Sequence, residues 1–529
     1  MSKPRSPGTA SRHIAADSGP WPLHDIGATR RLEAQALAAH APHTLMLRAG
    51  SAVARLALAV APQAQRVLVL AGPGNNGGDG LVAARLLHGL GLQVQVLLLA
   101  DPARQPADAA RANAEAVAAG VPVQDANTHE GPLPDADVLI DALLGLGASH
   151  AFAGPLAALL ARARDARGRG TRVLAIDLPS GLDADRGSAS EGTLPADWTL
   201  ALLTLKPGLH THQGRDLAGD VWLDTLGLEL NTADASAWLA GPWRAPLRAH
   251  AAHKGIYGDV IAIGGAAGMG GALWLAGRAA LAAGAGRVYL SARDTRAAAV
   301  DPAWPELMSQ PAAWSLPPAR LARSTVLCGC GGGEGLREVL PSLLRHAARL
   351  LLDADALNAV AAESGLRSAL RARAAHGLPT VLTPHPLEAA RLLGLAAAEV
   401  QADRLRAAQT LADQLQSVVV LKGSGSVIAT PAGHGQPVIN PSGNAALATA
   451  GTGDVLAGWI AGHWSPADAA HGASGEEGPS GSASAVACAA RTATEAVWWH
   501  GHAADRYRAL GHHGPLRASA LIEALMQAG

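Results

Sequence analysis

The chain has 529 residues, of which 49% are apolar and 16% are charged. It is too long for a single hydrophobic core, and its apolar content is that of folded α/β enzymes rather than of a disordered chain. With a formal net charge of −1, the chain has no overall attraction for nucleic acid or for an anionic membrane, so we expect neither as a partner.

The first half of the chain predicts one α/β domain. Residues 1–20 are polar and contain Ser, Pro and Gly, which predicts a flexible tail, and helices are expected within 32–60. From residue 66 onward, short apolar runs alternate with Ala-, Leu- and Arg-rich segments of helical type. This alternation predicts a Rossmann-like, doubly wound parallel sheet in a domain at 21–235. The expected strands are 67–70, 94–99, 138–141, 173–177 and 200–205.

The second half predicts another α/β domain at 248–529, after a linker at 236–247 that contains Trp, Pro and Gly. The uncharged stretch 260–277 is interrupted by six glycines, so it is interpreted as a strand, a turn and a helix start rather than as a membrane span. Residues 465–484 are expected to form a mobile surface loop. The expected strands are 260–263, 287–290, 325–328, 350–353, 380–382 and 418–421.

Two scarce residue types restrict the chemistry. The three cysteines, Cys328, Cys330 and Cys488, cannot form a disulfide framework, so we expect buried thiols in a cytoplasmic protein. Only four of the 42 basic residues are lysines. Because arginine supplies generic positive charge in this chain, a lysine is expected where a compact ammonium is needed. Three of these lysines lie in glycine-containing motifs, namely Lys206, Lys254 and Lys422.

Polar residues follow three of the strands in the first half. The segment from Ala71 to Gly80, AGPGNNGGDG, opens a helix, where glycines allow close approach and free amides favour phosphate. Later strand ends carry acids in DALLGLG and IDLPSG. For one such acid alone, helix capping is the better interpretation, but the carboxyl ends of parallel strands meet at one edge of a sheet. The sequence therefore predicts a site that gathers Asn75, Asn76, Asp79, Asp141, Asp177 and Ser180.

Together these three motifs resemble the NAD(P)H-hydrate epimerase family over residues 22–230. The resemblance implies that Asn76, Asp141 and Ser180 bind a potassium ion and that Asp177 lies at the reacting carbon. It also implies that the hydrated dinucleotide is held by Asn75, Asn76, Gly77, Gly78 and Asp79, together with Gly145, Leu146, Gly147, Ala148, Ser149, His150 and Ala151.

Epimerisation at carbon 6 of the hydrated ring needs a group that takes up and returns a proton as the hydroxyl leaves or the ring opens. We expect Asp177 to be that group. Lys206 is expected to stabilise developing negative charge or to contact phosphate, and the alternative is a solvated lysine at a strand end. The family has an aromatic residue where this chain has Leu144, which is expected to alter packing only.

The second half contains Asn440-Pro-Ser-Gly-Asn444, followed by Gly451-Thr-Gly-Asp454 at a helix start. Glycines at a helix start expose amides that neutralise a phosphoryl group in transfer, and an adjacent aspartate takes the proton of the attacking hydroxyl. This arrangement is typical of ribokinase-like enzymes. Supporting motifs are KGSGS at 422–426, TPHPLE at 383–388, and Asp353 with Asp355. For these two aspartates, a purely structural role as strand-end caps or in ion pairs is as good an explanation as a role in the site.

With HKGIYG at 253–258, IGG at 263–265, GMGGA at 268–272 and PELM at 305–308, these motifs resemble ADP-dependent NAD(P)H-hydrate dehydratases over residues 245–527. Departures are GCGGG at 329–333, where the family has GPGLG, and Leu387, where glycine is usual. The resemblance implies contacts with the hydrate by Ala272, Gly331, His385 and Asp454. It implies contacts with the adenine nucleotide by Lys422, Gly423, Ser424, Gly425, Ser426 and Gly453.

The implied reaction repairs hydrated NADH and NADPH. The first half would interconvert the R and S hydrates. The second half would transfer a phosphoryl group from ADP, with Mg²⁺, to the hydroxyl of the S hydrate, with Asp454 as base, before phosphate leaves. The resemblance also implies a homo-oligomer. The alternatives are a ribokinase-like small-molecule kinase fused to a nucleotide-binding domain, and a non-catalytic nucleotide-sensing or RNA-binding scaffold. The C-terminal histidines, such as His500, are expected on helix surfaces or at caps.

Overall fold

The computed structural model describes residues 11–146, 152–229, 232–244, 248–465 and 482–527. The chain forms two compact units that divide between Trp238 and Leu239, inside the stretch expected to be a linker. The outer limits of the two domains stay predictions. Most of the expected loop 465–484 lies outside the described residues, as do Gly147, Ala148, Ser149, His150 and Ala151.

The first unit contains a sheet in the order β1-β9-β8-β7-β6-β3-β4-β5, in which the pairing of β1 with β9 is antiparallel and the others are parallel. The strand order reverses beside β3, and ligands of such sheets bind at the carboxyl ends of the strands at that point. The strands are β1 (Arg12–His13), β3 (Arg66–Ala71), β4 (Gln93–Leu98), β5 (Val123–Asp125), β6 (Val138–Ala142), β7 (Arg172–Ile176), β8 (Trp198–Leu202) and β9 (Asp220–Asp224), with the short β2 (Trp21–Leu23) outside this sheet.

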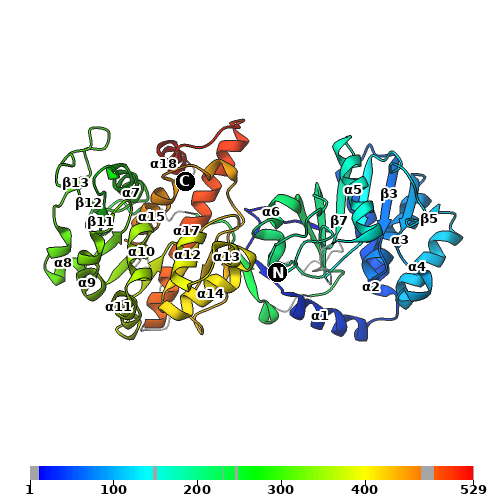
Figure 1. The fold of residues 1–529 in the computed structure, drawn as a ribbon, viewed down its shortest axis with the longest axis horizontal. Coiled ribbons are helices and arrows are strands. Elements are labelled where there is room, and N and C mark those ends of the chain that lie inside the picture. Colours follow the sequence, from blue (N-terminus) through cyan, green and yellow to red (C-terminus); the bar gives the residue numbers. More distant parts are fainter. Residues whose placement is uncertain (1–10, 147–151, 230–231, 245–247, 466–481, 528–529) are drawn as a thin grey trace. The chain divides into compact units, whose positions relative to one another are not determined.

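Helices cover both faces of this sheet (Figure 1). Along β3, Val67 and Val69 pack in the core with α2, α3 and α4, whereas Leu68 and Leu70 pack in the core with α5. Because both faces are buried, the strands are continuous apolar runs. The helices are α1 (Ile26–Ala39), α2 (Thr44–Val60), α3 (Asn75–Gly89), α4 (Ala107–Ala118), α5 (Gly154–Gly168) and α6 (Gly214–Leu217).

The second unit contains a sheet in the order β13-β12-β11-β14-β15-β16-β17-β18-β19. Pairing is parallel as far as β17, and β18 and β19 are added antiparallel. The strands are β11 (Asp259–Gly264), β12 (Arg287–Ala292), β13 (Met308–Ser309), β14 (Ser324–Cys328), β15 (Arg349–Leu352), β16 (Thr380–Leu382), β17 (Val418–Leu421), β18 (Val427–Ala429) and β19 (Val438–Ile439); β10 (Ala237–Leu239) lies where the units divide.

This sheet is also buried on both faces. Along β11, Val260 and Ala262 pack with α7, α15, α17 and α18, whereas Ile261 and Ile263 pack with α9 to α14. The predicted fold class of two α/β domains is therefore confirmed. The helices are α7 (Gly270–Ala282), α8 (Pro318–Leu321), α9 (Leu336–His346), α10 (Ala354–Ala362), α11 (Ser364–Ala375), α12 (Pro386–Leu393), α13 (Ala397–Ala402), α14 (Arg404–Leu415), α15 (Thr452–Trp464), α17 (Ser482–Ala509) and α18 (Ala518–Gln527).

The expected strands are present, with some ends shifted. The stretch 260–277 divides into a strand, a turn and a helix as predicted. Among the described helices, none is long and apolar enough to cross a membrane. The strand expected at 200–205 ends at Leu202, because Leu203 has a φ of 66°, which extended backbone does not allow.

Candidate functional site

The first candidate site begins with an unusual backbone conformation at two neighbouring strand ends. Asp177 directly follows β7 with a φ of 67°, and Leu203 directly follows β8 with a φ of 66°. Such a conformation costs a non-glycine residue about 1–2 kcal/mol. The Asp177 amide donates to Leu200 O at 2.8 Å, and the Leu202 amide donates to Asp177 Oδ1 at 3.1 Å. These bonds fix the Asp177 carboxylate across the ends of both strands.

Lys206 completes this arrangement. Its side chain is fully buried, and its ammonium donates to Asp177 Oδ1 and, at 2.8 Å, to Leu202 O. The alternative of a solvated lysine is therefore wrong. Removal of either charge from a buried ion pair leaves the other uncompensated, so each of these two side chains depends on the other.

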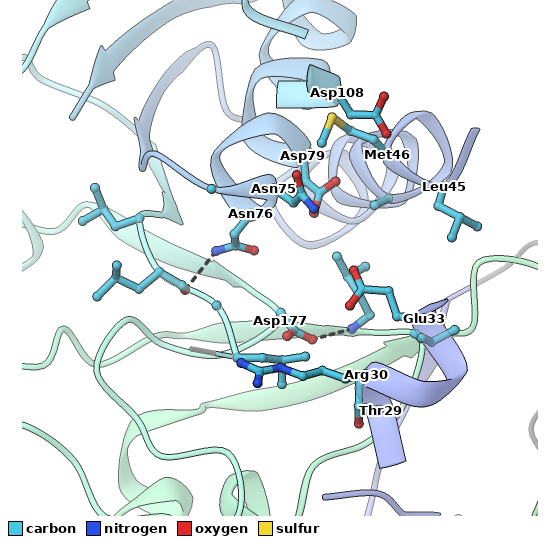
Figure 2. Close-up of a pocket in the computed structure, with 18 of the residues that line it drawn as sticks. Thr29, Arg30, Glu33, Leu45, Met46, Asn75, Asn76, Asp79, Asp108 and Asp177 are labelled. Carbon is cyan, nitrogen blue, oxygen red and sulfur yellow. Dashed lines mark hydrogen bonds between the residues drawn. The ribbon is translucent and has the colours of Figure 1, made fainter. Parts of the chain in front are cut away.

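A cavity of about 680 Å³ lies at these strand ends. Figure 2 shows Asn75, Asn76 and Asp79 on one side, Asp177 on another, and α1 closing the remainder with Glu33. Gly145 and Leu146 also line the cavity, so the structure brings together five of the seven described residues that were expected to hold the dinucleotide.

Gly77 and Gly78 belong to the same predicted set but do not line this cavity. A Cβ on Gly77 would lie 2.1 Å from Gly72 O, and one on Gly78 would lie 2.5 Å from Met46 Cε. Both contacts are far too short, so these glycines let α3 pack closely against the turn after β3 and against α2. They position Asn75 and Asn76 rather than line the cavity.

Two carboxyl groups in the cavity have shifted pKa values. Burial raises the pKa of Asp79 well above its usual value, and Asp177 and Glu33 raise it further. Burial, followed by the Asp177 charge, also raises the pKa of Glu33. Sequence reasoning missed Glu33 because no glycine-rich or strand-end motif surrounds it. The one available signal was that it is the single acid of α1.

Asn76, Asp141 and Ser180, the expected potassium ligands, also lie together. Ser180 donates to Asp141 through its hydroxyl at 2.6 Å and its amide at 2.9 Å. The Leu144 amide donates to Ser180 Oγ at 2.9 Å. Asn76 Nδ2 donates to Leu144 O at 2.9 Å, and this bond from Asn76 is drawn in Figure 2. Asp141 is fully buried, and that burial raises its pKa although the hydrogen bonds oppose the rise.

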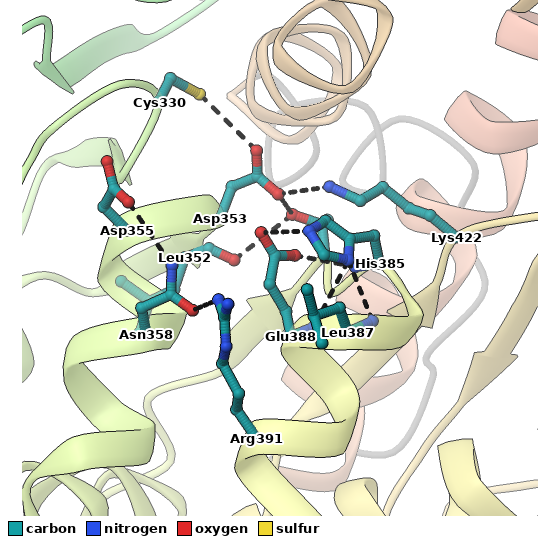
Figure 3. A network of polar contacts seen from close by, with 11 residues as sticks. Cys330, Leu352, Asp353, Asp355, Asn358, His385, Leu387, Glu388, Arg391 and Lys422 are labelled. Carbon is teal, nitrogen blue, oxygen red and sulfur yellow. Dashed lines mark hydrogen bonds and ion pairs between the residues drawn. The ribbon is translucent and has the colours of Figure 1, made fainter. Parts of the chain in front are cut away.

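The second candidate site is built around Asp353, which follows β15. Lys422 Nζ and the Thr383 hydroxyl each lie 2.7 Å from Asp353 Oδ1 (Figure 3). The Asp353 side chain does not cap α10, so of its two alternative roles the structure has the ion pair. Burial alone would lower the pKa of Lys422, but the charges of Asp353 and Glu388 outweigh it and raise the pKa. Asp355 instead accepts the Gly333 amide at 2.9 Å.

Asp454 lies beside this ion pair, in the first turn of α15. One carboxylate oxygen of Asp454, one of Asp353 and Cys330 Sγ all lie within 4.8 Å of one another. Burial and the Asp353 charge raise the pKa of Asp454 to about 6. A Cβ on Gly453 would lie 3.5 Å from Lys422 Nζ, so the Gly451–Asp454 turn and the Lys422–Ser426 loop meet here.

The other residues expected to contact the hydrate are Ala272, Gly331 and His385. A Cβ on Gly331 would lie 3.0 Å from Ala272 Cβ, so these two residues are neighbours. His385 Nδ1 accepts the Leu387 amide at 3.1 Å and the Glu388 amide at 3.4 Å, which makes His385 the N-cap of α12 (Figure 3). Leu387 itself is exposed, so its bulk points away from the buried centre.

Three other residues differ from what the sequence indicated. Lys254 is exposed, unlike the other two motif lysines. His500 is buried rather than on a helix surface, and its Nε2 lies 3.0 Å from Thr452 O at the start of α15. Arg404, which carried no sequence signal, is buried behind the Lys422–Ser426 loop and donates to Leu421 O at 3.1 Å and Lys422 O at 3.2 Å.

Comparison with known proteins matches each half separately. The family described as YjeF-related protein N-terminus matches residues 42–208, and the family described as NAD(P)H-hydrate dehydratase matches residues 260–526. An ADP/ATP-dependent NAD(P)H-hydrate dehydratase from Bacillus subtilis, co-crystallised with ATP and Mg²⁺, is 28% identical, with a TM-score of 0.40 over 54% of this chain and 93% of that chain.

Curated relatives match across both halves. A bifunctional NAD(P)H-hydrate repair enzyme from Coxiella burnetii is 36% identical over 380 residues, which cover 69% of this chain and 74% of that protein. Another from Moorella thermoacetica is 37% identical over 435 residues, which cover 75% of this chain and 78% of that protein. Both resemblances seen in the sequence are thereby confirmed, and the chain belongs to the family of bifunctional NAD(P)H-hydrate repair enzymes.

Proposed function

We propose that this chain repairs hydrated NADH and NADPH in two steps, with epimerisation in the first unit and ADP-consuming dehydration in the second. The observation that carries the proposal is that each unit has a lysine paired with a buried aspartate at the carboxyl ends of its parallel strands. These pairs are Lys206 with Asp177 and Lys422 with Asp353. They use two of the four lysines of a chain that otherwise relies on arginine.

In the first unit, the hydrated nicotinamide lies in the 680 Å³ cavity with carbon 6 beside Asp177. Asn75, Asn76, Asp79, Gly145 and Leu146 hold the dinucleotide. The ion pair with the buried ammonium of Lys206 holds the Asp177 side chain in place, and Asp177 accepts a proton during the reaction. Gly77 and Gly78 support this site by letting α3 begin close to the turn.

The group of Asn76, Asp141 and Ser180 fits a potassium ion. Its donors are oxygens, and among the described residues no cationic side chain pairs with the buried Asp141 carboxylate. Bound there, the ion would supply the positive charge that this carboxylate lacks. Asn76 and Ser180 both form hydrogen bonds with the Leu144 peptide, so the same group also fixes the backbone beside the cavity.

In the second unit, Asp454 takes the proton of the hydrate's hydroxyl as the oxygen attacks the β-phosphorus of ADP, and AMP leaves. Phosphate then departs with the bonding pair of the carbon–oxygen bond, and loss of the neighbouring proton restores the ring double bond. The backbone amides of Gly451–Gly453 and the Lys422 ammonium stabilise the phosphoryl group in transfer. Ala272, Gly331 and His385 border the hydrate, and Gly423, Ser424, Gly425 and Ser426 border the nucleotide.

The carboxylates available to Mg²⁺ are those of Asp353 and Asp454, which have oxygens within 4.8 Å of each other. Carboxylate oxygens suit this cation, so the site fits it. Bound with the nucleotide, Mg²⁺ would offset the charge of the phosphates.

The test uses each purified hydrate separately. The S hydrate of NADPH with ADP and Mg²⁺ should yield NADPH, AMP and phosphate in equal amounts. The R hydrate without ADP should yield S hydrate, measured by chromatography. A stable phosphorylated product without recovered NADPH would contradict the dehydratase and indicate a small-molecule kinase. No interconversion of the hydrates above the uncatalysed rate would contradict the epimerase.

A further inference from the structure

The cavity of the first unit receives a carboxyl group from outside the strand-end motifs. Glu33 lies on α1, which the structure ties to the loops of the sheet by several bonds. Thr29 Oγ1 lies 2.8 Å from Thr204 Oγ1 in a buried contact, and the Ile26 amide donates to Asp185 Oδ1 at 2.8 Å. Glu33 lies one helical turn after Thr29 and therefore on the same face of α1.

These contacts aim Glu33 into the cavity rather than into solvent. Its carboxyl group faces the same space as those of Asp79 and Asp177 (Figure 2). Among the described residues, the Glu33 carboxyl forms no hydrogen bond or ion pair. A partly buried carboxyl group that lines a cavity and has no hydrogen bond or ion pair is available to a bound ligand.

The charges in the cavity divide the carboxyl groups into two kinds. Asp177 is paired with Lys206. Glu33 has no such partner, and burial and the Asp177 charge raise its pKa, although Lys206 and Arg30 oppose the rise. The cavity thus offers an ion-paired carboxylate at the end of β7 and, on α1, a carboxyl group that takes up a proton more readily than a free glutamate.

Inversion at carbon 6 needs both kinds of group if the hydroxyl leaves. When the carbon–oxygen bond breaks, its electron pair goes to the oxygen, which takes a proton and departs as water while the nitrogen lone pair forms the carbon–nitrogen double bond. Water then adds from the opposite face and gives up a proton. No proton is gained or lost overall, but the donor and the acceptor act on opposite faces of a planar ring.

We propose that Glu33 is the second acid/base residue of the epimerisation, and that it serves one face of the hydrated ring while Asp177 serves the other. In one direction Glu33 protonates the departing hydroxyl and Asp177 takes the proton of the incoming water. In the reverse direction the two roles exchange, and solvent resets the protons between turnovers. The proposal rests on the proposed epimerase function of the first unit.

The test is the Glu33→Gln variant of the full chain, assayed with purified R hydrate in the absence of ADP. General acid–base catalysis contributes about 10²–10⁴-fold. The epimerase kcat should therefore fall by about 10²-fold or more, whereas KM changes by less than about threefold because the amide preserves shape. Dehydration of S hydrate by the same preparation should be unchanged, which shows that the chain is intact.

A pH profile separates this role from a structural one. The wild-type epimerase should lose activity at high pH as Glu33 loses its proton, and the Gln variant should lack that alkaline limb. The charged groups that face Glu33 are Arg30, Asp79, Asp177 and Lys206, and the variant keeps all of them. The matched control is Arg31→Gln, on the exposed side of α1, which should keep the wild-type rate and profile.

The outcomes are distinct. An inactive wild-type epimerase would overturn the proposed function and this inference with it. An active wild type with an equally active Glu33→Gln variant would overturn this inference alone. If the Gln variant unfolds, the Glu33→Asp variant is assayed in its place, because it keeps a carboxyl group. Measurable epimerisation with the alkaline limb retained supports the role of Glu33. An epimerisation rate of Glu33→Asp no higher than that of the Gln variant contradicts it.

Discussion

At the residue scale, each of the two sites depends on a lysine that is paired with a buried aspartate. Lys206 is fully buried against Asp177, and Lys422 lies 2.7 Å from Asp353. The loss of one partner from a buried pair leaves an uncompensated charge, which is more destabilising than the loss of both. Both pairs lie at strand ends, where their charges can act on a bound ligand.

We expect Asp177→Asn to lower the stability of the first unit by about 3 kcal/mol, because the Lys206 ammonium then lacks its counter-ion. The double variant Asp177→Asn with Lys206→Met should recover part of that stability without recovering epimerase activity. Chemical denaturation followed by tryptophan fluorescence measures the first quantity, and interconversion of the hydrates measures the second. A double variant as active as the wild type would show that Asp177 is not catalytic.

The dehydratase should lose activity as the pH falls through about 6. Burial and the Asp353 charge raise the pKa of Asp454 to about 6, so this carboxyl takes up a proton below that pH and can no longer act as a base. Asp353→Asn removes one cause of the shift and should move the acid limb of kcat/KM to lower pH. If the acid limb of this variant stays at the wild-type pH, Asp454 is not the group whose titration is observed.

At the element scale, the glycine-rich loop after β17 depends on a buried arginine from α14. Arg404 is 1% exposed and donates to the carbonyls of Leu421 and Lys422. A Cβ on Gly423 would lie 2.9 Å from Arg404 Nη1, so the guanidinium packs directly against the loop. Among the described residues no carboxylate pairs with Arg404, and burial lowers its pKa to about 10, which still leaves it charged at neutral pH.

We therefore expect Arg404→Lys to raise the KM for ADP about tenfold, because an ammonium cannot reach both carbonyls and the loop loses its support. Arg373 is a matched control. It is 2% exposed, donates to Leu344 O at 2.8 Å, and also has a pKa lowered to about 10 by burial, but it lies on α11, away from the loop. Arg373→Lys should cost comparable stability and leave the KM for ADP unchanged. Equal KM values in the two variants would contradict a role for Arg404 in the loop.

The strands and the motifs at their ends could be predicted from the sequence because buried parallel strands are continuous apolar runs followed by glycine and acid. The predicted group of Asn76, Asp141 and Ser180 does lie together, and the motifs that contain Asp353, Lys422 and Asp454 meet in one place. Glu33 and Arg404 could not be predicted in the same way. Each comes from a helix with no local motif, and only the tertiary packing of that helix brings it to a site.

At the scale of the whole molecule, each unit has its own hydrophobic cores. The clusters of the first unit contain residues between Met46 and Leu226, and those of the second contain residues between Ala240 and Leu525. No described core residue is shared. Damage to one core should therefore affect one activity.

Leu139→Ala tests this independence. Leu139 is fully buried in β6, and its truncation should cost about 2–5 kcal/mol of stability in the first unit. After mild heating, epimerase activity should be lost at a lower temperature than in the wild type, while dehydratase activity survives to the same temperature. Parallel loss of both activities would show that the two units unfold together.

The central claim is that one chain carries both steps of the repair. The most direct measurement is the absorbance of reduced nicotinamide after the wild-type chain is added to an equal mixture of R and S NADPH hydrates with ADP, Mg²⁺ and K⁺. The recording must end before uncatalysed epimerisation contributes. Recovery of all the NADPH is the predicted result. Recovery of half would contradict the epimerase in the first unit, and no recovery would contradict the dehydratase in the second.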